Sequence, residues 1–268
     1  MNRAATPMKP LSQLPAARLR GVFCDIDDTL TSEGRLTAEA YAALARLQAA
    51  GKLVIPITGR PAGWCDHIAR MWPVDAVVGE NGAFYFCYDA GERKLVKRFL
   101  LDAEQRAANR ERMIAVRERI LREVPGCALA SDQLYREADL AIDFCEDVPR
   151  LSIGEVDRIV ALMYSAGMTA KISSIHVNGW FGDYDKLDMT KILMLERHGV
   201  DLDSAKHDFV FAGDSPNDAP MFKFFPNSVG VANVVDFGAR LVDPPAYVTK
   251  ARSGGGFVEL VNHLLAGR

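Results

Sequence analysis

Short apolar runs alternate with segments of helical periodicity in the first and last thirds of the chain. The run at 22–24 has no polar face, which is typical of a strand buried on both sides of a parallel sheet, and the other runs are mostly apolar. Together the runs cover residues 22–24, 53–57, 74–78, 208–212, 228–232 and 247–248. The helical segments between them end at glycines such as Gly51 and Gly199, which suit a left-handed C-terminal residue. This alternation predicts an α/β fold with a Rossmann-like parallel sheet.

The middle of the chain has a different pattern. Residues 84–101 predict a hairpin, and a charged helix is expected over 103–124. Polar and apolar residues then alternate near 140–144, Ser152 and Glu155 fit a capping box that starts a helix, and residues 171–177 predict one further strand. Hairpin, helix, strand, helix, strand is an α+β pattern, so we expect an insertion within the parallel α/β fold.

Composition excludes several classes of protein. The chain has 268 residues, enough for two domains or for one domain with an insertion, and its net charge of −3 argues against a nucleic-acid partner. No apolar run is long enough to span a bilayer. Residues 1–20 lack the apolar centre of a secretion signal and are expected to be a disordered lead-in. The five cysteines are dispersed without a C-x-x-C pair, which favours reduced thiols and a cytoplasmic location.

Acidic residues gather where two of the predicted strands end. Asp25, Asp27 and Asp28 follow the strand at 22–24, and Asp214 and Asp218 follow the strand at 208–212. The carboxyl ends of neighbouring parallel strands lie at one edge of a sheet, where ligands bind. Burying such carboxylates is costly unless a cation or hydrogen bonds meet them, and the simplest cation is one that prefers oxygen ligands, such as Mg²⁺. The alternative is an acidic turn that only caps a helix.

Two further residues complete a site for phosphoryl transfer. Thr58 ends a third strand and can hold a phosphate oxygen, and Lys191 lies near the start of a helix and can supply positive charge. Either residue alone is usually structural. Together with an Asp nucleophile, a second Asp two positions later and a metal, they form the set that phosphoryl transfer needs.

Four motifs in this order resemble those of the haloacid dehalogenase (HAD) superfamily. The run at 25–29 resembles the D-x-D-x-T signature, and the run at 58–60 resembles the second motif. Lys191 resembles the third motif, and residues 213–218 resemble the fourth. The resemblance covers nearly the whole chain and implies a catalytic core with an inserted cap domain.

The position of the insertion indicates the branch of the superfamily. Room for a domain exists only between Thr58 and Lys191, which resembles the type IIB, or Cof-like, branch. The expected core domain is 1–84 and 186–268, and the expected cap domain is 85–185. Residues 80–83 and 213–218 resemble the corresponding motifs of mannosyl-3-phosphoglycerate phosphatases.

The resemblance also implies roles for individual residues. Asp25 would attack phosphorus to form an aspartyl-phosphate, and Asp27 would act as general acid and then general base. Mg²⁺ would be held by Asp25, Asp214 and the backbone carbonyl of Asp27, with support from Asp218. Thr58 and Lys191 would bind the transferring phosphoryl group. The residues implied to bind substrate around this centre are Gly59, Arg60, Asn81 and Asn217.

A polar strand face provides further candidates. Ser174, His176 and Asn178 alternate with apolar residues, so they share one face if this run is a strand. The ordinary interpretation is a face toward solvent. Because the run lies just before the return to the core domain, we hypothesise instead that His176 and Asn178 contact the leaving group.

These observations predict a Mg²⁺-dependent phosphatase that acts on a small phosphorylated metabolite, such as a sugar phosphate or a phosphoglycerate-like ester. Two alternatives remain open: a phosphomutase on the same scaffold and a non-catalytic phosphate-binding protein. A receiver-type signalling domain needs only about half this length and no cap. No nucleic-acid or membrane partner is expected, and the oligomeric state stays open.

Overall fold

The computed structural model describes residues 8–15 and 19–266, and its largest sheet has six strands, all paired in parallel. The strand order is β1-β15-β14-β13-β2-β5. These strands are β1 (Lys9–Pro10), β2 (Gly21–Cys24), β5 (Leu53–Pro56), β13 (Phe209–Gly213), β14 (Ser228–Gly230) and β15 (Tyr247–Val248). β2, β13 and β14 are buried along their whole length, as expected of strands without a polar face. The predicted α/β fold is confirmed.

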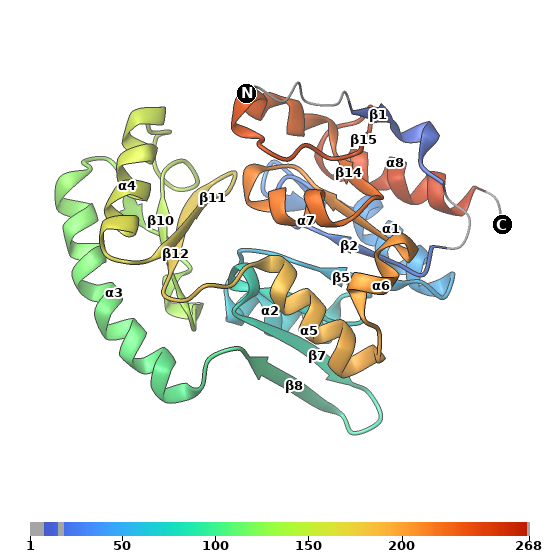
Figure 1. Ribbon diagram of the computed structural model, residues 1–268, viewed down its shortest axis with the longest axis horizontal. Helices are drawn as coiled ribbons and strands as arrows, with labels where there is room; N and C mark the ends of the chain where they lie inside the picture. The colour runs from blue at the N-terminus through green and yellow to red at the C-terminus, as the bar shows by residue number, and fades with distance from the viewer. Residues whose placement is uncertain (1–7, 16–18, 267–268) are drawn as a thin grey trace.

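Helices cover both faces of this sheet (Figure 1). β2 shows how the two faces are filled, because Val22 and Cys24 belong to one apolar cluster and Phe23 belongs to the other. The first cluster includes α1 and α8, and the second includes α5 and α7. The α-helices are α1 (Ala38–Ala49), α2 (Ala62–Met71), α3 (Ala103–Glu123), α4 (Ile153–Ser165), α5 (Lys186–His198), α6 (Leu202–Ala205), α7 (Ala219–Phe224) and α8 (Ser253–Leu265).

Pro56 lies within β5 even though proline has no N–H to donate to a strand ladder. The N–H groups of Leu53 and Ile57 point to β2, where they donate to the carbonyls of Arg20 and Cys24. By alternation the nitrogen of Pro56 points away from β2, so the proline removes no hydrogen bond between these two strands. The predicted strand at 53–57 is thereby confirmed.

The hairpin predicted after residue 84 is present, but it extends the larger sheet. β7 (Phe84–Asp89) and β8 (Lys94–Phe99) pair with each other, and β7 also pairs with β6 (Val77–Gly79). A parallel bridge from Ile57 to Val78 joins β6 to the residue that follows β5. A small hairpin, β3 (Thr31–Ser32) and β4 (Arg35–Leu36), lies between β2 and α1.

A second group of elements, residues 102–182, forms a layer of its own, which we call the second lobe (Figure 1). Its four-stranded antiparallel sheet has the order β11-β12-β10-β9, and α3 and α4 pack against it. Its strands are β9 (Ala128–Leu129), β10 (Asp139–Asp143), β11 (Thr169–Ile172) and β12 (His176–Trp180). The remaining described residues, including β6, β7 and β8, are called the core. The predicted insertion begins at residue 85, whereas the pairing of β7 with β6 attaches the hairpin to the core.

The single strand predicted at 171–177 is wrong. The chain turns back at residues 173–175, so that Ile172 of β11 pairs with Val177 of β12. The Ser173 hydroxyl oxygen accepts the His176 N–H at 3.0 Å and stabilises this turn without glycine or proline. Ser174 therefore lies in the turn, and only His176 and Asn178 share a strand face as predicted.

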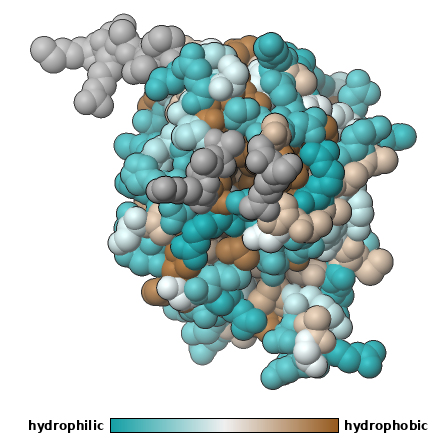
Figure 2. Space-filling view, turned by 90° about the vertical axis from the view of Figure 1, so that its right-hand side faces the viewer, coloured by the Kyte–Doolittle hydropathy of each residue, from teal (hydrophilic) through white to brown (hydrophobic). Residues whose placement is uncertain are grey.

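The ends and surface of the chain add three observations. Residues 9–10 form β1 beside β15, so this part of the expected disordered lead-in is ordered, while residues 1–7 and 16–18 lie outside the described part. All five cysteines are free. Across the described residues, no helix has both the length and the apolar content needed to cross a bilayer. The face in Figure 2 is mostly hydrophilic, with hydrophobic residues scattered over it.

Candidate active site

The two predicted acid clusters meet at the carboxyl edge of the parallel sheet. Cys24 and Ala212 are register partners in β2 and β13, so Asp25 and Asp214 follow neighbouring strands. Asp218 comes from the 3-10 turn Pro216–Asp218 directly after β13. Carboxylate oxygens of these three residues lie within 4.8 Å of one another, and all three residues are buried. The structure thus brings together the acids that the sequence predicts to converge.

The acid cluster carries more negative charge than its surroundings balance. Burial raises the pKa of Asp25 well above its usual range, and the charges of Asp218 and Asp27 raise it further, although Lys186 lowers it. The pKa of Asp214 is likewise raised by burial and by Asp25 and Asp218. A cation would relieve this repulsion. Three oxygen donors at this spacing fit a hard divalent ion such as Mg²⁺.

The side chains of the cluster are oriented by hydrogen bonds. Asp218 Oδ2 accepts the N–H groups of Asp214 and Ser215, at 3.1 Å and 3.3 Å. Asp214 accepts the Thr29 hydroxyl at 3.2 Å and the Asn233 amide at 3.3 Å. Asp218 therefore positions the loop that carries Asp214, and its support of a metal ion stays a prediction.

The lysine of the site is Lys186, and the prediction of Lys191 is wrong. Lys186 Nζ donates to Asp25 Oδ1 at 2.6 Å and to Asp218 Oδ1 at 2.7 Å. Burial lowers its pKa, but the charges of Asp218 and Asp25 raise it by more, so the lysine is protonated. Lys191 lies on another face of α5, where it pairs with Asp203 at 2.7 Å.

The error arises from where α5 begins. We predicted a helix start at Asp188, whereas Asp185 caps the helix and Asp188 is the N3 residue of its capping box. Lys186 is therefore in the first turn, beside the 3-10 turn Glu80–Gly82 of the core. Gly82, at φ 109°, permits this approach, because a side chain there would meet the Asp185 carbonyl oxygen at 2.0 Å.

Most of the other predicted residues surround one small cavity of about 10 Å³. It lies between the core and the second lobe. The predicted residues that line it are Asp25, Asp27, Gly59, Arg60, His176, Asn178 and Asn217. Thr58 follows β5 at the same edge of the sheet, where its hydroxyl oxygen accepts the Arg60 N–H at 3.0 Å. Asn81 lies behind Gly59, with a buried side-chain nitrogen that lacks a hydrogen-bond partner in the described part of the chain.

Arg60 is bound more tightly than the sequence suggested. Its guanidinium donates to both carboxylate oxygens of Asp27, at 3.0 Å and 3.1 Å, and to Glu146 of the second lobe at 2.9 Å. Its charge also lies 4.4 Å from the centre of the Trp64 ring. Glu146 in turn lies 2.9 Å from His176 Nε2, and Asn178 donates to Asp139 at 2.9 Å. The polar face of β12 is thus part of a network that reaches Asp27.

Two buried residues that sequence reasoning missed hold the second lobe against the core. Arg136 of the second lobe donates to the Gly59 carbonyl oxygen at 2.9 Å. Glu80 of the core accepts backbone N–H groups of Glu137, Ala138 and Asp139. Burial and the charge of Asp139 raise the pKa of Glu80 to about 8. Such contacts join segments that are more than fifty residues apart, and no local pattern predicts them.

Known proteins share both sequence and fold with this chain. Residues 22–107 match the family model of haloacid dehalogenase-like hydrolases. A phosphoglycolate phosphatase of Methanospirillum hungatei is 27% identical over 259 residues, which cover 92% of this chain and 99% of that protein.

Two solved structures share the fold at low sequence identity. A protein of Thermoplasma acidophilum has a TM-score of 0.69 and 18% identity, and the match covers 92% of this chain and 98% of that one. A HAD/COF-like hydrolase of Plasmodium vivax has a TM-score of 0.69 and 16% identity, with 95% and 98% covered. The resemblance to mannosyl-3-phosphoglycerate phosphatases stays a prediction. The chain is thus similar to haloacid dehalogenase-like hydrolases in sequence over residues 22–107, and it shares its fold with these two solved structures.

Proposed function

We propose that this protein is a Mg²⁺-dependent phosphatase that hydrolyses a small phosphorylated metabolite through an aspartyl-phosphate on Asp25. The observation that carries the proposal is the contact of Asp25 with Lys186 inside the buried acid cluster, directly beside the cavity that Asp27 lines. A nucleophile, a fixed positive charge and a cation site are thereby adjacent, as phosphoryl transfer requires.

The residues present support a two-step reaction. An oxygen of Asp25 attacks phosphorus, the bond from phosphorus to the leaving oxygen breaks, and Asp27 donates a proton to that oxygen. Asp27 then accepts a proton from a water molecule, whose oxygen attacks the same phosphorus and releases phosphate from Asp25. Lys186 holds Asp25 Oδ1 and leaves the second carboxylate oxygen without a hydrogen bond to any described residue.

Asp25, Asp214 and the main chain at Asp27 would hold the Mg²⁺ ion in this proposal. Asp214 is buried and its pKa is raised, as expected of a carboxylate among other acids without a cation. The Asp27 carboxylate accepts a hydrogen bond from Arg60, so the main chain of Asp27 is the part that would bind the ion. When bound, Mg²⁺ supplies positive charge that offsets the charge of the phosphoryl oxygens and of the acids.

We further propose that the second lobe acts as the cap that selects the leaving group. Its β12 contributes His176 and Asn178 to the small cavity, and its turn contributes Ser173 and Ser174. The contacts of the hairpin support cap boundaries near 102 and 182 in place of 85 and 185. The cytoplasmic location stays a prediction from the cysteine pattern.

Release of inorganic phosphate tests the function. Wild-type protein with Mg²⁺ is assayed on phosphoglycolate, which the name of the M. hungatei relative suggests, and on a panel of sugar phosphates and glycerate phosphates. We expect steady release of phosphate without a bisphosphate activator, and none from Asp25→Asn, which cannot form the acyl-phosphate. Transfer of phosphate between positions of one sugar would indicate the phosphomutase. Turnover by Asp25→Asn near the wild-type rate would overturn the proposal.

A further inference from the structure

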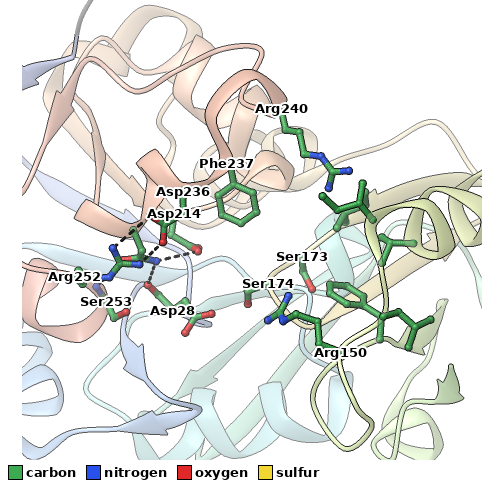
Figure 3. Close-up of a pocket in the computed structure, with 16 residues that line it drawn as sticks. Asp28, Arg150, Ser173, Ser174, Asp214, Asp236, Phe237, Arg240, Arg252 and Ser253 are labelled. Carbon is green, nitrogen blue, oxygen red and sulfur yellow. Dashed lines mark hydrogen bonds and ion pairs between the residues drawn. The ribbon is translucent and has the colours of Figure 1, made fainter. Parts of the chain in front are cut away.

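A second and much larger cavity adjoins the acid cluster. It has a volume of about 500 Å³, lies between the two lobes and reaches Asp28 and Asp214 (Figure 3). Its wall from the second lobe is largely apolar and includes Phe144, Leu151 and Ile172. Three arginines also line it, Arg150 from the second lobe and Arg240 and Arg252 from the core.

This cavity offers the space that the small cavity lacks. The small cavity beside Asp25 and Asp27 has about 10 Å³, which is close to the space that one water molecule occupies. The two cavities share Ser173 and Ser174 in the turn between β11 and β12. A leaving group attached to a phosphoryl at Asp25 therefore has room on the side of Asp28 and this turn.

The three arginines differ in what they already bind. Arg252 forms an ion pair with Asp236, and Arg240 lies 3.5 Å from Asp157. Arg150 makes neither an ion pair nor a hydrogen bond with any residue in the described part of the chain. Figure 3 shows its guanidinium next to Ser174 and directed toward Asp28. The Arg150 guanidinium lies 5.9 Å from the centre of the Phe144 ring, and its charge acts to lower the pKa of Asp28. Its hydrogen-bond donors have no partner in the described part of the chain, so they are available to a ligand.

The loop that carries Arg150 is fixed at both ends. At its start, Asp143 accepts the N–H groups of Cys145 and Glu146, at 2.8 Å and 2.7 Å. At its end, the Leu151 N–H donates to the Phe144 carbonyl at 2.9 Å. A charged side chain on a preformed loop loses less conformational entropy when it binds a ligand.

Ser174 provides a second indication. Its hydroxyl oxygen is buried and makes no hydrogen bond of good geometry with any described residue, although it lies close enough to Asp28 to favour the ionised form of that carboxyl and so lower its pKa. A buried hydroxyl without a partner costs free energy, so a ligand oxygen at this place would be stabilising. Ser174 and Arg150 therefore present a hydroxyl and a guanidinium to the same part of the cavity.

We propose, building on the proposed function, that this cavity holds the leaving group and that Arg150 and Ser174 bind a carboxylate on it. The substrates are then phosphomonoesters of hydroxy acids. The cavity offers the positive charge of Arg150 for a ligand, and the negative charge of Asp28 offsets part of it. This balance suits a ligand group with one negative charge better than a second phosphate with two. Guanidinium geometry matches a carboxylate in two hydrogen bonds, and the apolar wall suits the carbon skeleton.

A matched pair of esters tests this assignment. 3-Phosphoglycerate and glycerol 3-phosphate differ only in a carboxylate against a hydroxymethyl group. We expect wild-type protein to prefer 3-phosphoglycerate, and Arg150→Ala to lose about 10- to 100-fold in kcat/KM on that ester, chiefly through KM. The loss on glycerol 3-phosphate should be about ten-fold smaller. Arg150→Lys should recover part of the loss, because it restores charge without the planar fork. Arg158→Ala, an exposed arginine of α4 that pairs with Glu123, is the control.

The outcomes separate this inference from the proposed function. Equal losses on both esters, or no preference in the wild type, would overturn the carboxylate assignment. A larger loss on fructose 1,6-bisphosphate than on 3-phosphoglycerate would assign Arg150 to a second phosphate instead. Calorimetry measures the affinity of 3-phosphoglycerate for Asp25→Asn, with and without Arg150→Ala. Because Asp25→Asn does not turn over, this affinity reports the contact with Arg150 directly. A weaker complex in the double variant supports the assignment even if no ester is hydrolysed, and equal affinities contradict it.

Discussion

Arg60 Nη2 lies 2.9 Å from Glu146 Oε1 and also 2.9 Å from Asp27 Oδ1. One guanidinium therefore joins the proposed general acid of the core to the second lobe. In the proposed mechanism Asp27 donates a proton to the leaving oxygen, so this guanidinium would release at least one of its contacts with Asp27 when a substrate is bound. The position of the second lobe and the availability of Asp27 are thus linked through Arg60.

The first prediction concerns the two lysines of α5. Lys186→Met should lower kcat by about 100-fold or more, because it removes the fixed charge beside the nucleophile. Lys191→Met, five positions later on the same helix, should stay close to wild type in phosphate release. Thermal melting of both variants checks the fold, and Lys186→Arg separates charge from packing. A greater loss for Lys191→Met than for Lys186→Met would contradict the site described above.

The second prediction concerns the cation. Removal of divalent ions with a chelator should abolish phosphate release, and added Mg²⁺ should restore it far better than Ca²⁺. Ca²⁺ takes more ligands at longer distances and disturbs in-line attack. The same chelation should lower the melting temperature of wild-type protein more than that of Asp214→Asn, since repulsion among the acids is then uncompensated. Full activity in excess chelator would exclude a role for a metal.

The third prediction uses the pH dependence of Glu146. A hydrogen bond with His176 and the charge of Arg60 lower the pKa of Glu146 to about 2 from its usual 4.5. A lowered pKa in the folded state means that the ionised group stabilises the fold above about pH 4.5, and that this contribution is lost as the pH falls toward 2.

Glu146→Gln should therefore reduce the free energy of unfolding by about 1–2 kcal/mol at neutral pH, after allowance for solvent screening. The difference from wild type should persist down to about pH 5 and shrink below it. Chemical unfolding at a series of pH values measures this. A difference that grows as the pH falls would show that the pair is not formed in solution. Glu111→Gln, at an exposed position of α3, is a control outside the network between the lobes.

The fourth prediction concerns His176. His176→Ala removes the partner of Glu146 next to the small cavity, so kcat/KM should fall about ten-fold on the preferred ester. The fall on p-nitrophenyl phosphate should be smaller, because that generic ester makes few contacts beyond the phosphoryl. His67→Ala, an exposed histidine of α2, is the matched control. Equal losses on both esters would indicate a defect in the fold or in lobe closure.

The elements that sequence predicted well are those whose signals are local. Buried strands without a polar face, the acids after β2 and β13, and the capping box at Ser152 each follow from a few neighbouring residues. Lys186 was missed although its signal was also local: Asp185 and Asp188 form a capping box that places the lysine in the first turn. The turn at 173–175 was missed because a serine hydroxyl stabilises it in place of glycine or proline.

The contacts between the lobes could not be predicted in the same way. Arg60 and Glu146 are 86 positions apart, and Glu80 and Ala138 are 58 apart. Arginines and glutamates are common on solvated surfaces, and nothing in their local sequence marks these as buried partners. Only the fold brings these residues together. The resemblance to the haloacid dehalogenase motifs therefore predicted the acids at the centre of the site but not the contacts between the lobes around them.

Glu80 has a consequence for exchanging second lobes between related enzymes. Its carboxylate, from the core, accepts three successive backbone N–H groups of the second lobe. In the opposite direction, Arg136 of the second lobe donates a hydrogen bond to the Gly59 carbonyl oxygen of the core. A graft of residues 102–182 onto another core would leave those buried amides unsatisfied unless the recipient carries an acid at the same place. The transferable unit is therefore the lobe together with the Glu80 turn and the Gly59 loop, so a change of specificity by recombination has to carry three separate segments of the chain.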